Sequence, residues 1–266
     1  MPLTPTGSAF REDAEHFERL APSLWNPVGN ALVAAAEVGL GDRVLDVGCG
    51  TGAATIPAAQ TAGPDGYVDG LDRSDAMLEA AGAKARTLNL DTVRLHAADP
   101  MQWDPAEPYD VVLAAYAVYG LAELDAGAAR LVAMLRAGGT LALSTWADGA
   151  LVPFGPLLAE ACTAEGVDPG LARELAGRIG RLNTPDRLRN WLEGLGLEQV
   201  QVQAVPATVQ LTPDLAWSLV LGSDLRRLLP EDPAAVERVR SRLLGELGGE
   251  SAFNADSLLA VGRRAA

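Results

Sequence analysis

Residues 43–52, Arg-Val-Leu-Asp-Val-Gly-Cys-Gly-Thr-Gly, join a short apolar run to three closely spaced glycines. Val44, Leu45 and Val47 are typical of a buried parallel strand, and a helical pattern begins at about Ala53. Glycines allow a tight turn and let a ligand approach the backbone closely. Because ligands bind beyond the strand ends of an open parallel sheet, this strand–turn–helix arrangement predicts a nucleotide-type site.

The acidic residue beside this turn, Asp46, distinguishes between two classes of ligand. Gly48-x-Gly50-x-x-Ala53 fits a dinucleotide pattern, and Asp72 follows at about the spacing of an acid that binds a ribose. A pyrophosphate is anionic, so the Asp46 carboxylate would repel it, whereas the same carboxylate would attract a cation. S-adenosylmethionine (SAM) carries a sulfonium and an ammonium group, and the turn therefore favours SAM.

Two stretches of the chain resemble a known family. Val-Leu-Asp-Val-Gly-Cys-Gly-Thr-Gly resembles motif I of the class I SAM-dependent methyltransferases, and Gly-Leu-Asp-Arg-Ser-Asp-Ala-Met-Leu resembles their second motif. The resemblance covers about residues 40–146 well and the last strands loosely. It is nearest to the small-molecule branch, similar to quinone-type C-methyltransferases and natural-product tailoring methyltransferases. It implies that Asp72 binds both ribose hydroxyls and that Asp99 binds the adenine amino group.

The resemblance also implies which other positions contact the cofactor. In the family the amide after the adenine-binding acid binds a ring nitrogen, but Pro100 has no N–H, so the Met101 amide or a water would have to serve. Backbone near Ala114 and Ala115 should face the methionine part of SAM. The complete predicted set is Asp46, Gly48, Cys49, Gly50, Thr51, Gly52, Asp72, Arg73, Met77, Asp99, Pro100, Met101, Ala114 and Ala115.

The methyl acceptor is expected above the strand ends, in a pocket lined by aromatic side chains. The candidates are Phe10, Phe17, Trp25, Tyr119, Trp146 and Phe154. Their character indicates a largely hydrophobic small molecule, although core packing explains each residue taken alone. His16 is the candidate general base and Tyr116 the candidate hydrogen-bond partner of the acceptor. A solvated helix-flank histidine and a packed tyrosine are the alternative interpretations.

The implied reaction is an in-line displacement that moves the SAM methyl group to an O, N or C atom and leaves S-adenosylhomocysteine (SAH). The sulfonium is already activated, so the protein mainly aligns the reactants and excludes water. Secondary metabolism is the expected setting. Two alternatives remain open: an enzyme of the same fold whose bound SAM supports a rearrangement or cyclisation, and an NAD-linked oxidoreductase.

The composition limits which binding partners and which cellular compartment are expected. The 266 residues carry a formal net charge of −14, which repels phosphate backbones and anionic lipid, so neither nucleic acid nor a membrane is expected as a partner. No signal segment or bilayer-length apolar stretch is recognised. Cys49 and Cys162 match no metal spacing, which predicts reduced thiols, a cytoplasmic protein and no metal. Lys84, the only lysine, falls at a helix position expected to be exposed. A homodimer is compatible with helical lids of this kind.

Alternating strand and helix patterns predict a Rossmann-like α/β fold with a doubly wound, seven-stranded, mostly parallel sheet and an antiparallel last strand. The expected strands are 44–47, 66–72, 93–97, 109–116, 140–146, 199–204 and 258–262. The expected parts are an N-terminal helical lid (1–40), a SAM-binding core (41–146), a helical insertion with the last core helix (147–196), and a C-terminal strand pair (197–266) with a helical insertion at 213–248.

Three local expectations complete this prediction. Helices are expected at 10–21 and 31–37, after a loose stretch at 1–9. A helix at 121–135 is expected to end at the glycines of Ala137-Gly138-Gly139. His96 is expected to be a packed or hydrogen-bonded strand residue.

Overall fold

The protein is built on one seven-stranded sheet, seen here in a computed structural model that describes residues 7–249 and 251–266, with side chains from residue 14 onward. The strand order is β3-β2-β1-β4-β5-β9-β6. The strands are β1 (Arg43–Val47), β2 (Tyr67–Asp72), β3 (Val93–Ala97), β4 (Tyr109–Ala115), β5 (Leu135–Trp146), β9 (Ser257–Arg264) and β6 (Leu197–Val205). The first five run parallel, and β9 is antiparallel to both of its neighbours. The predicted fold class is confirmed.

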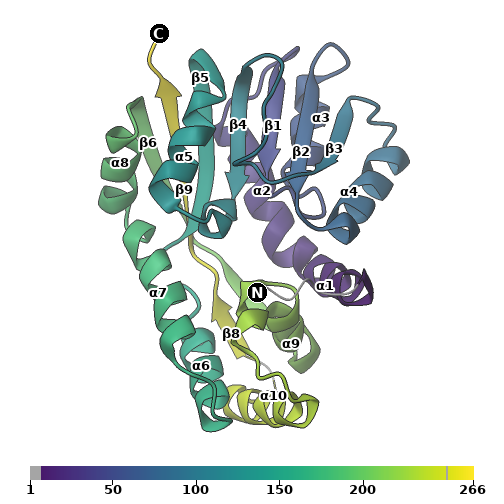
Figure 1. The fold of residues 1–266 in the computed structure, drawn as a ribbon, viewed down its shortest axis with the longest axis vertical. Coiled ribbons are helices and arrows are strands. Elements are labelled where there is room, and N and C mark those ends of the chain that lie inside the picture. Colours follow the sequence, from purple (N-terminus) through teal and green to yellow (C-terminus); the bar gives the residue numbers. More distant parts are fainter. Residues whose placement is uncertain (1–6, 250) are drawn as a thin grey trace.

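Helices cover both faces of this sheet (Figure 1). α2 (Asn26–Ala35) and α3 (Thr55–Ala62) bury small apolar residues against one face, and α4 (Asp75–Thr87) packs beside α3. α5 (Leu124–Ala133) and α8 (Pro185–Gly194) bury leucines against the other face. Within the described residues, no helix combines the length and the apolar character needed to cross a bilayer.

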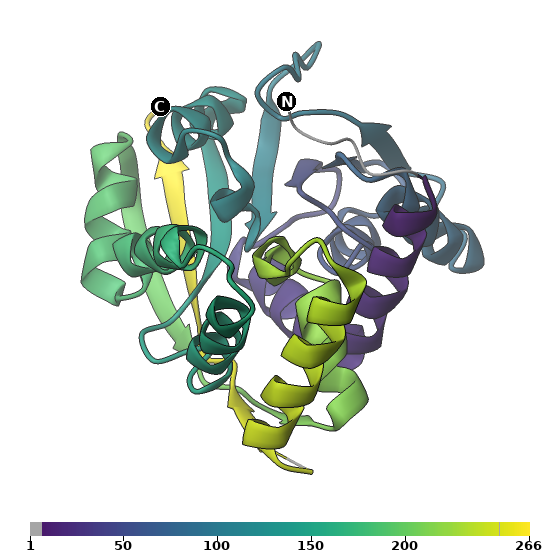
Figure 2. The same ribbon diagram turned by 60° about the horizontal axis from the view of Figure 1, so that its bottom comes forward.

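A second group of elements lies beyond the carboxyl ends of the parallel strands (Figures 1 and 2). This cap consists of α6 (Phe154–Ala164), α9 (Pro213–Leu221), α10 (Pro233–Leu247) and a two-stranded sheet, β7 (Thr208–Leu211) with β8 (Ser251–Asn254). α7 (Gly170–Leu182) joins it to the core, and a 3-10 turn, η3 (Asp224–Leu228), joins α9 to α10. α1 (Gly7–Leu20) and a π-helical turn, η1 (Ala21–Trp25), bring the N-terminal segment against the cap.

Several predicted boundaries differ from the structure for local reasons. The glycine stop expected at 137–139 is wrong, because β5 already begins at Leu135, which pairs with Tyr109. The helix expected at 31–37 begins earlier, at Asn26, since Pro27 is tolerated in a first helical turn. The short strands β7 and β8, which pair only with each other, were not predicted.

A buried polar network joins β2, β3 and β4. Asp69 is 6% exposed, and its two carboxylate oxygens lie 2.9 Å from Nε2 of His96 and 2.8 Å from the hydroxyl of Tyr109. The indole of Trp103, from the helix-free 98–108 segment, donates to the Tyr109 hydroxyl and packs on the His96 ring. The expectation for His96, a hydrogen-bonded strand residue, is confirmed.

Removing the Tyr109 hydroxyl is expected to destabilise the fold. Tyr109→Phe leaves one buried Asp69 oxygen without its donor, a loss that typically lowers the free energy of unfolding by about 1–3 kcal/mol. Urea unfolding followed by circular dichroism measures this value. Tyr67→Phe is the matched control, because its hydroxyl accepts from Arg43 at a half-buried position. Equal losses in the two variants would contradict the importance of the buried network.

Candidate active site

The glycine turn after β1 requires glycine for both conformational and steric reasons. Gly48, Gly50 and Gly52 have φ angles of 65°, 52° and 90°, in the left-handed region that side chains disfavour. A Cβ atom on Gly48 would lie 2.7 Å from the Cβ of Ala117, and one on Gly50 would lie 3.4 Å from the ring of Phe17. Glycine at these three positions leaves the backbone of the turn without side chains, so a ligand can approach it closely.

Asp46, at the end of β1, is a buried carboxylate with one oxygen lacking a partner. Its side chain is 1% exposed, and Oδ2 accepts a 2.6 Å hydrogen bond from the hydroxyl of Thr55, the first residue of α3. Oδ1 has no hydrogen-bond partner among the described residues. Burial raises the pKa of Asp46 to about 7; the Thr55 bond lowers it, and the charge of Asp72 raises it further. Such an oxygen can accept from a cationic or N–H-bearing ligand.

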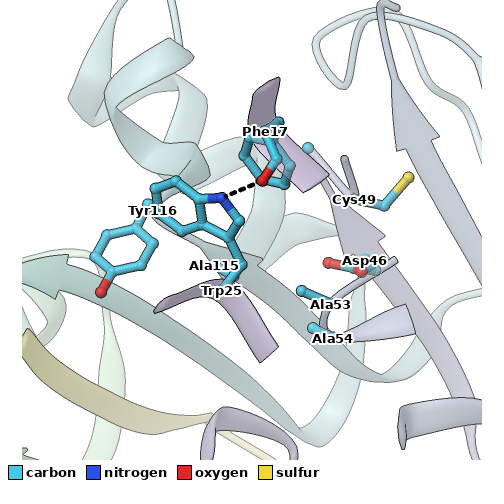
Figure 3. A pocket seen from close by; sticks show the side chains of 9 residues that line it. Phe17, Trp25, Asp46, Cys49, Ala53, Ala54, Ala115 and Tyr116 are labelled. Carbon is cyan, nitrogen blue, oxygen red and sulfur yellow. Dashed lines mark hydrogen bonds between the residues drawn. The ribbon is translucent and has the colours of Figure 1, made fainter. Parts of the chain in front are cut away.

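Asp46 lines a cavity of about 30 Å³ between the turn and the N-terminal segment (Figure 3). The rings of Phe17 and Trp25 stack, with centroids 4.7 Å apart, and the Trp25 indole N–H donates to the Phe17 carbonyl at 3.0 Å. These two residues close the cavity opposite the turn. Its lining is Phe17, Trp25, Asp46, Gly48, Cys49, Ala53, Ala54, Ala115 and Tyr116.

Two further carboxylates follow β2 and β3. Asp72 accepts from the backbone amides of Gly50 and Ser74, both at 2.9 Å. Burial raises the pKa of Asp72 more than these bonds lower it. Because one of its oxygens is bonded to the amide of Gly50, the Asp72 carboxylate lies beside the glycine turn, as the sequence predicted.

Asp99 is more exposed, and its pKa is lowered. Burial alone would raise that pKa, but bonds from the Met101 amide at 2.9 Å and from the Arg73 guanidinium at 2.8 Å outweigh it. The Met101 amide was expected to replace the N–H that Pro100 lacks. In the structure this amide already donates to Asp99.

Aromatic rings continue from the cavity along the ends of β4 and β5. Tyr116 and Trp146 stack with centroids 4.4 Å apart, and Trp25 presents an edge to each, at 5.8 and 6.4 Å. Phe253 of β8 packs against Trp146 and Phe154. We call these six residues, Phe17, Trp25, Tyr116, Trp146, Phe154 and Phe253, the aromatic wall. Phe253 is not among the predicted site residues, because β8 was not predicted.

Tyr116 is held by its backbone and its hydroxyl. It has a left-handed φ of 54°, its amide donates to Ser144 Oγ at 3.0 Å, and its hydroxyl is hydrogen-bonded to Ser257. Burial raises the pKa of this phenol. In Figure 3 the hydroxyl points away from Asp46. Tyr119 lies nearby and accepts from the Trp146 amide.

His16, Met77 and Phe10 are also among the predicted site residues. His16 Nδ1 is 3.0 Å from the hydroxyl of Ser218 in α9. The Met77 amide donates to the hydroxyl of Ser74, which caps α4. The side chain of Phe10 lies outside the described residues.

Lys84 is more enclosed than the sequence indicated. Its side chain is 31% exposed, and Nζ pairs with Glu18 of α1 at 2.8 Å and lies 3.4 Å from the Thr51 hydroxyl of the turn. The lysine expected to be exposed therefore ties α1 to the core.

Comparison with known proteins agrees with this geometry. Residues 44–139, from β1 into β5, match the family model described as a methyltransferase domain. These residues therefore form a methyltransferase domain. The cofactor of such a domain is SAM.

The chain is also similar to two curated relatives and to one solved structure. The chain is 34% identical over 138 residues to aklanonic acid methyltransferase DauC of Streptomyces sp. strain C5, covering 52% of this chain and 63% of the relative. It is 36% identical over 138 residues to nocamycin O-methyltransferase of Saccharothrix syringae, covering 48% and 49%. The chain thus spans about half to two thirds of these relatives. The YcgJ protein of Bacillus subtilis has the same fold, with a TM-score of 0.59 and 17% identity over 90% of this chain and 98% of that one.

The residues of the methyltransferase domain fit SAM, but their present packing leaves little room. The unpartnered oxygen of Asp46 and the open backbone of the turn suit a ligand with a cationic end. Sites for ligands of this size usually measure about 300–1,000 Å³, whereas the cavity measures about 30 Å³. The lining of this cavity contains neither Asp72 nor Asp99, so the cavity is only the part of the site between Asp46 and the rings of Phe17 and Trp25.

Proposed function

We propose that this protein transfers the SAM methyl group to an oxygen atom of a small, largely apolar molecule in secondary metabolism and releases SAH. The observation that carries the proposal is the buried carboxylate of Asp46, which has one unpartnered oxygen and lines a cavity between the glycine turn and the aromatic wall. A cation-binding group next to apolar rings suits a charged methyl donor beside an uncharged acceptor surface. The names of the nocamycin O-methyltransferase and aklanonic acid methyltransferase support a small acceptor, and the first supports oxygen.

In this proposal the core residues bind the cofactor and the aromatic wall aligns the acceptor. Asp46 holds the cationic methionine end of SAM, Asp72 the ribose hydroxyls and Asp99 the adenine amino group. Bound SAM supplies a methyl group already activated by the sulfonium. The aromatic wall then orients the acceptor and excludes water, which is the main work of catalysis in such a displacement.

A proton acceptor is needed only where the acceptor oxygen is not ionised. His16 is the candidate for this role, and Tyr116 is the candidate hydrogen-bond partner of the acceptor. His16 is bonded to Ser218 of the cap, and Tyr116 is bonded to Ser257 of β9. A general base at His16 would have to exchange its Ser218 bond for the acceptor. The pH profile of kcat for His16→Ala tests this role; an unchanged profile assigns the residue to positioning α1.

Binding and product assays separate the proposed function from its rivals. Isothermal titration calorimetry with SAM and with NADH is expected to give binding of SAM alone, and NADH binding would favour the oxidoreductase. Mass spectrometry of reactions with SAM and a panel of apolar hydroxy and carboxylic acids is expected to show SAH and an acceptor heavier by one methylene unit. A converted acceptor without SAH would favour the rearrangement.

Asp72→Ala is expected to weaken SAM binding by more than about tenfold, because each hydrogen bond to a charged group contributes about 1.5–3 kcal/mol. Calorimetric Kd values for the two proteins measure the effect. Asp75→Ala is the matched control, because it removes an exposed carboxylate three residues away, at the first residue of α4. If the two variants bind SAM equally well, Asp72 does not hold the ribose.

A further inference from the structure

Three consecutive residues of α1 contact three different parts of the protein. His16 is bonded to Ser218 of α9 in the cap. The ring of Phe17 lies against the glycine turn and stacks on Trp25. Glu18 pairs with Lys84 of α4 in the core. One turn of α1 therefore touches the cap, the cofactor site and the core together.

The contact between α1 and α9 leaves no space for the two helices to move closer together. Gly222 ends α9, and a Cβ atom there would lie 2.5 Å from the Phe17 nitrogen and 2.8 Å from the His16 carbonyl carbon. The two backbones are thus in direct contact. Because packed elements shift as units rather than deform, a displacement of α1 toward α9 at this point pushes α9 with it.

Cofactor binding acts on this same turn of α1. The ring of Phe17 lies over Gly50, 3.4 Å from the position of an added Cβ, and Phe17 and Trp25 together close the cavity beside Asp46, so a ligand that reaches the turn from this side meets both rings. The backbone of Phe17 is the surface against which Gly222 packs. Trp25, bonded to the Phe17 carbonyl, also contacts Tyr116 and Trp146, where the acceptor is proposed to lie.

We propose that residues 16–18 of α1 couple the cofactor site to the cap. SAM or SAH displaces Phe17 and Trp25 from the turn, α1 shifts, and α9 moves with it, which frees the aromatic wall for the acceptor. His16, Phe17 and Gly222 are positioning residues, and the Glu18–Lys84 pair sets the position of α1 in the ligand-free state. By linkage, an acceptor held under the cap strengthens cofactor binding by the same factor. The inference rests on the proposed function, because it requires SAM or SAH in the turn.

Hydrogen–deuterium exchange tests the coupling without knowledge of the acceptor. The full chain is measured with and without saturating SAH, and two regions are compared: the glycine turn (43–54) and α9 (213–221). SAH is expected to slow exchange in the turn and to speed exchange in α9 by at least about fivefold, the lower end of typical coupling between sites. Exchange reports local opening, so it detects a change in α9 at a distance from the ligand.

Two glycine variants provide the matched comparison. Gly222→Ala places a methyl group against the α1 backbone, and α9 is expected to lose its response to SAH although the turn is still protected. Gly245→Ala, in α10, has nothing within 4 Å of the added methyl group and is expected to keep the full response. Ser218→Ala, which removes only the His16 bond, is a milder variant that is expected to reduce the response by at least about half.

The outcomes distinguish the coupling from the proposed function. Protection of the turn by SAH with no change in α9 of the unmodified protein overturns the coupling alone. An unchanged α9 response in Gly222→Ala and Ser218→Ala also overturns it, since the contact would then not transmit the shift. No protection of the turn at any SAH concentration overturns the proposed function, and the coupling with it.

Discussion

Gly50→Val is expected to abolish SAM binding, with an affinity loss of more than about 100-fold, or at least about 2.7 kcal/mol. Gly50 has a φ of 52°, where a β-branched side chain is strained, and its amide donates to Asp72. The substitution therefore distorts the turn, pulls away the Asp72 carboxylate that we propose binds the ribose, and fills the space that the ligand needs. Calorimetry with SAM measures the loss, and circular dichroism confirms that the variant is folded.

The matched control for this variant is Gly177→Val, at an exposed helical position of α7 with open space around an added Cβ. It adds the same side chain away from the turn and is expected to leave the Kd for SAM unchanged. Retention of SAM affinity by a folded Gly50→Val protein would show that the cofactor does not approach this turn.

Affinity for SAM is expected to decrease as the pH falls below about 7, because of Asp46. Burial raises the pKa of this carboxyl to about 7 in the ligand-free protein. A bound cation favours the ionised form and lowers that pKa in the complex. Above pH 7 the ionised group is present and binding is strongest. Below it, a proton must leave on binding, so affinity falls by up to about tenfold per pH unit.

Asp46→Asn separates the charge from the shape of this side chain. The amide keeps the size of the residue and can still accept from Thr55, but it cannot ionise. We expect a loss of about 10- to 100-fold in SAM affinity at pH 8, equivalent to about 1.5–3 kcal/mol, and a much flatter dependence on pH.

Asp72 is the other acid beside the turn, and its pKa is also raised. An Asp72→Asn variant therefore serves as the comparison. It is expected to keep the decrease in affinity but to shift it to a lower pH, because the charge of Asp72 raises the pKa of Asp46. A Kd for the unmodified protein that is constant between about pH 5.5 and 8.5 would contradict the role of Asp46.

The sheet and the glycine turn could be predicted because their signals are local. Short apolar runs bounded by turn residues mark β1 to β4, and Gly48, Gly50 and Gly52 follow directly on a strand. Strand ends in a parallel sheet share one edge, so Asp46 and Asp72 could be expected to lie close together without any knowledge of packing. The Gly50–Asp72 hydrogen bond is consistent with that expectation.

The features that were not predicted depend on contacts between distant segments. The spacing of residues around Lys84 gives no sign of Glu18, which is 66 positions away on a helix outside the core. Thr55 faces Asp46 only because α3 folds back against β1, and Phe253 reaches Trp146 only through an unpredicted strand. The stacking of Phe17 and Trp25 over the turn likewise follows from the packing of α1, which hydrophobic periodicity alone does not fix.

The position of β9 inside the sheet affects how the chain folds during synthesis. β9 is synthesised after the strands on both of its sides, β5 and β6, yet it lies between them and pairs with each. On the ribosome, those two strands emerge with unpaired edges that invite association with other chains. Chaperone protection at that stage, or expression at low temperature, should therefore improve the yield of native protein more than it would for a sheet completed in sequence order.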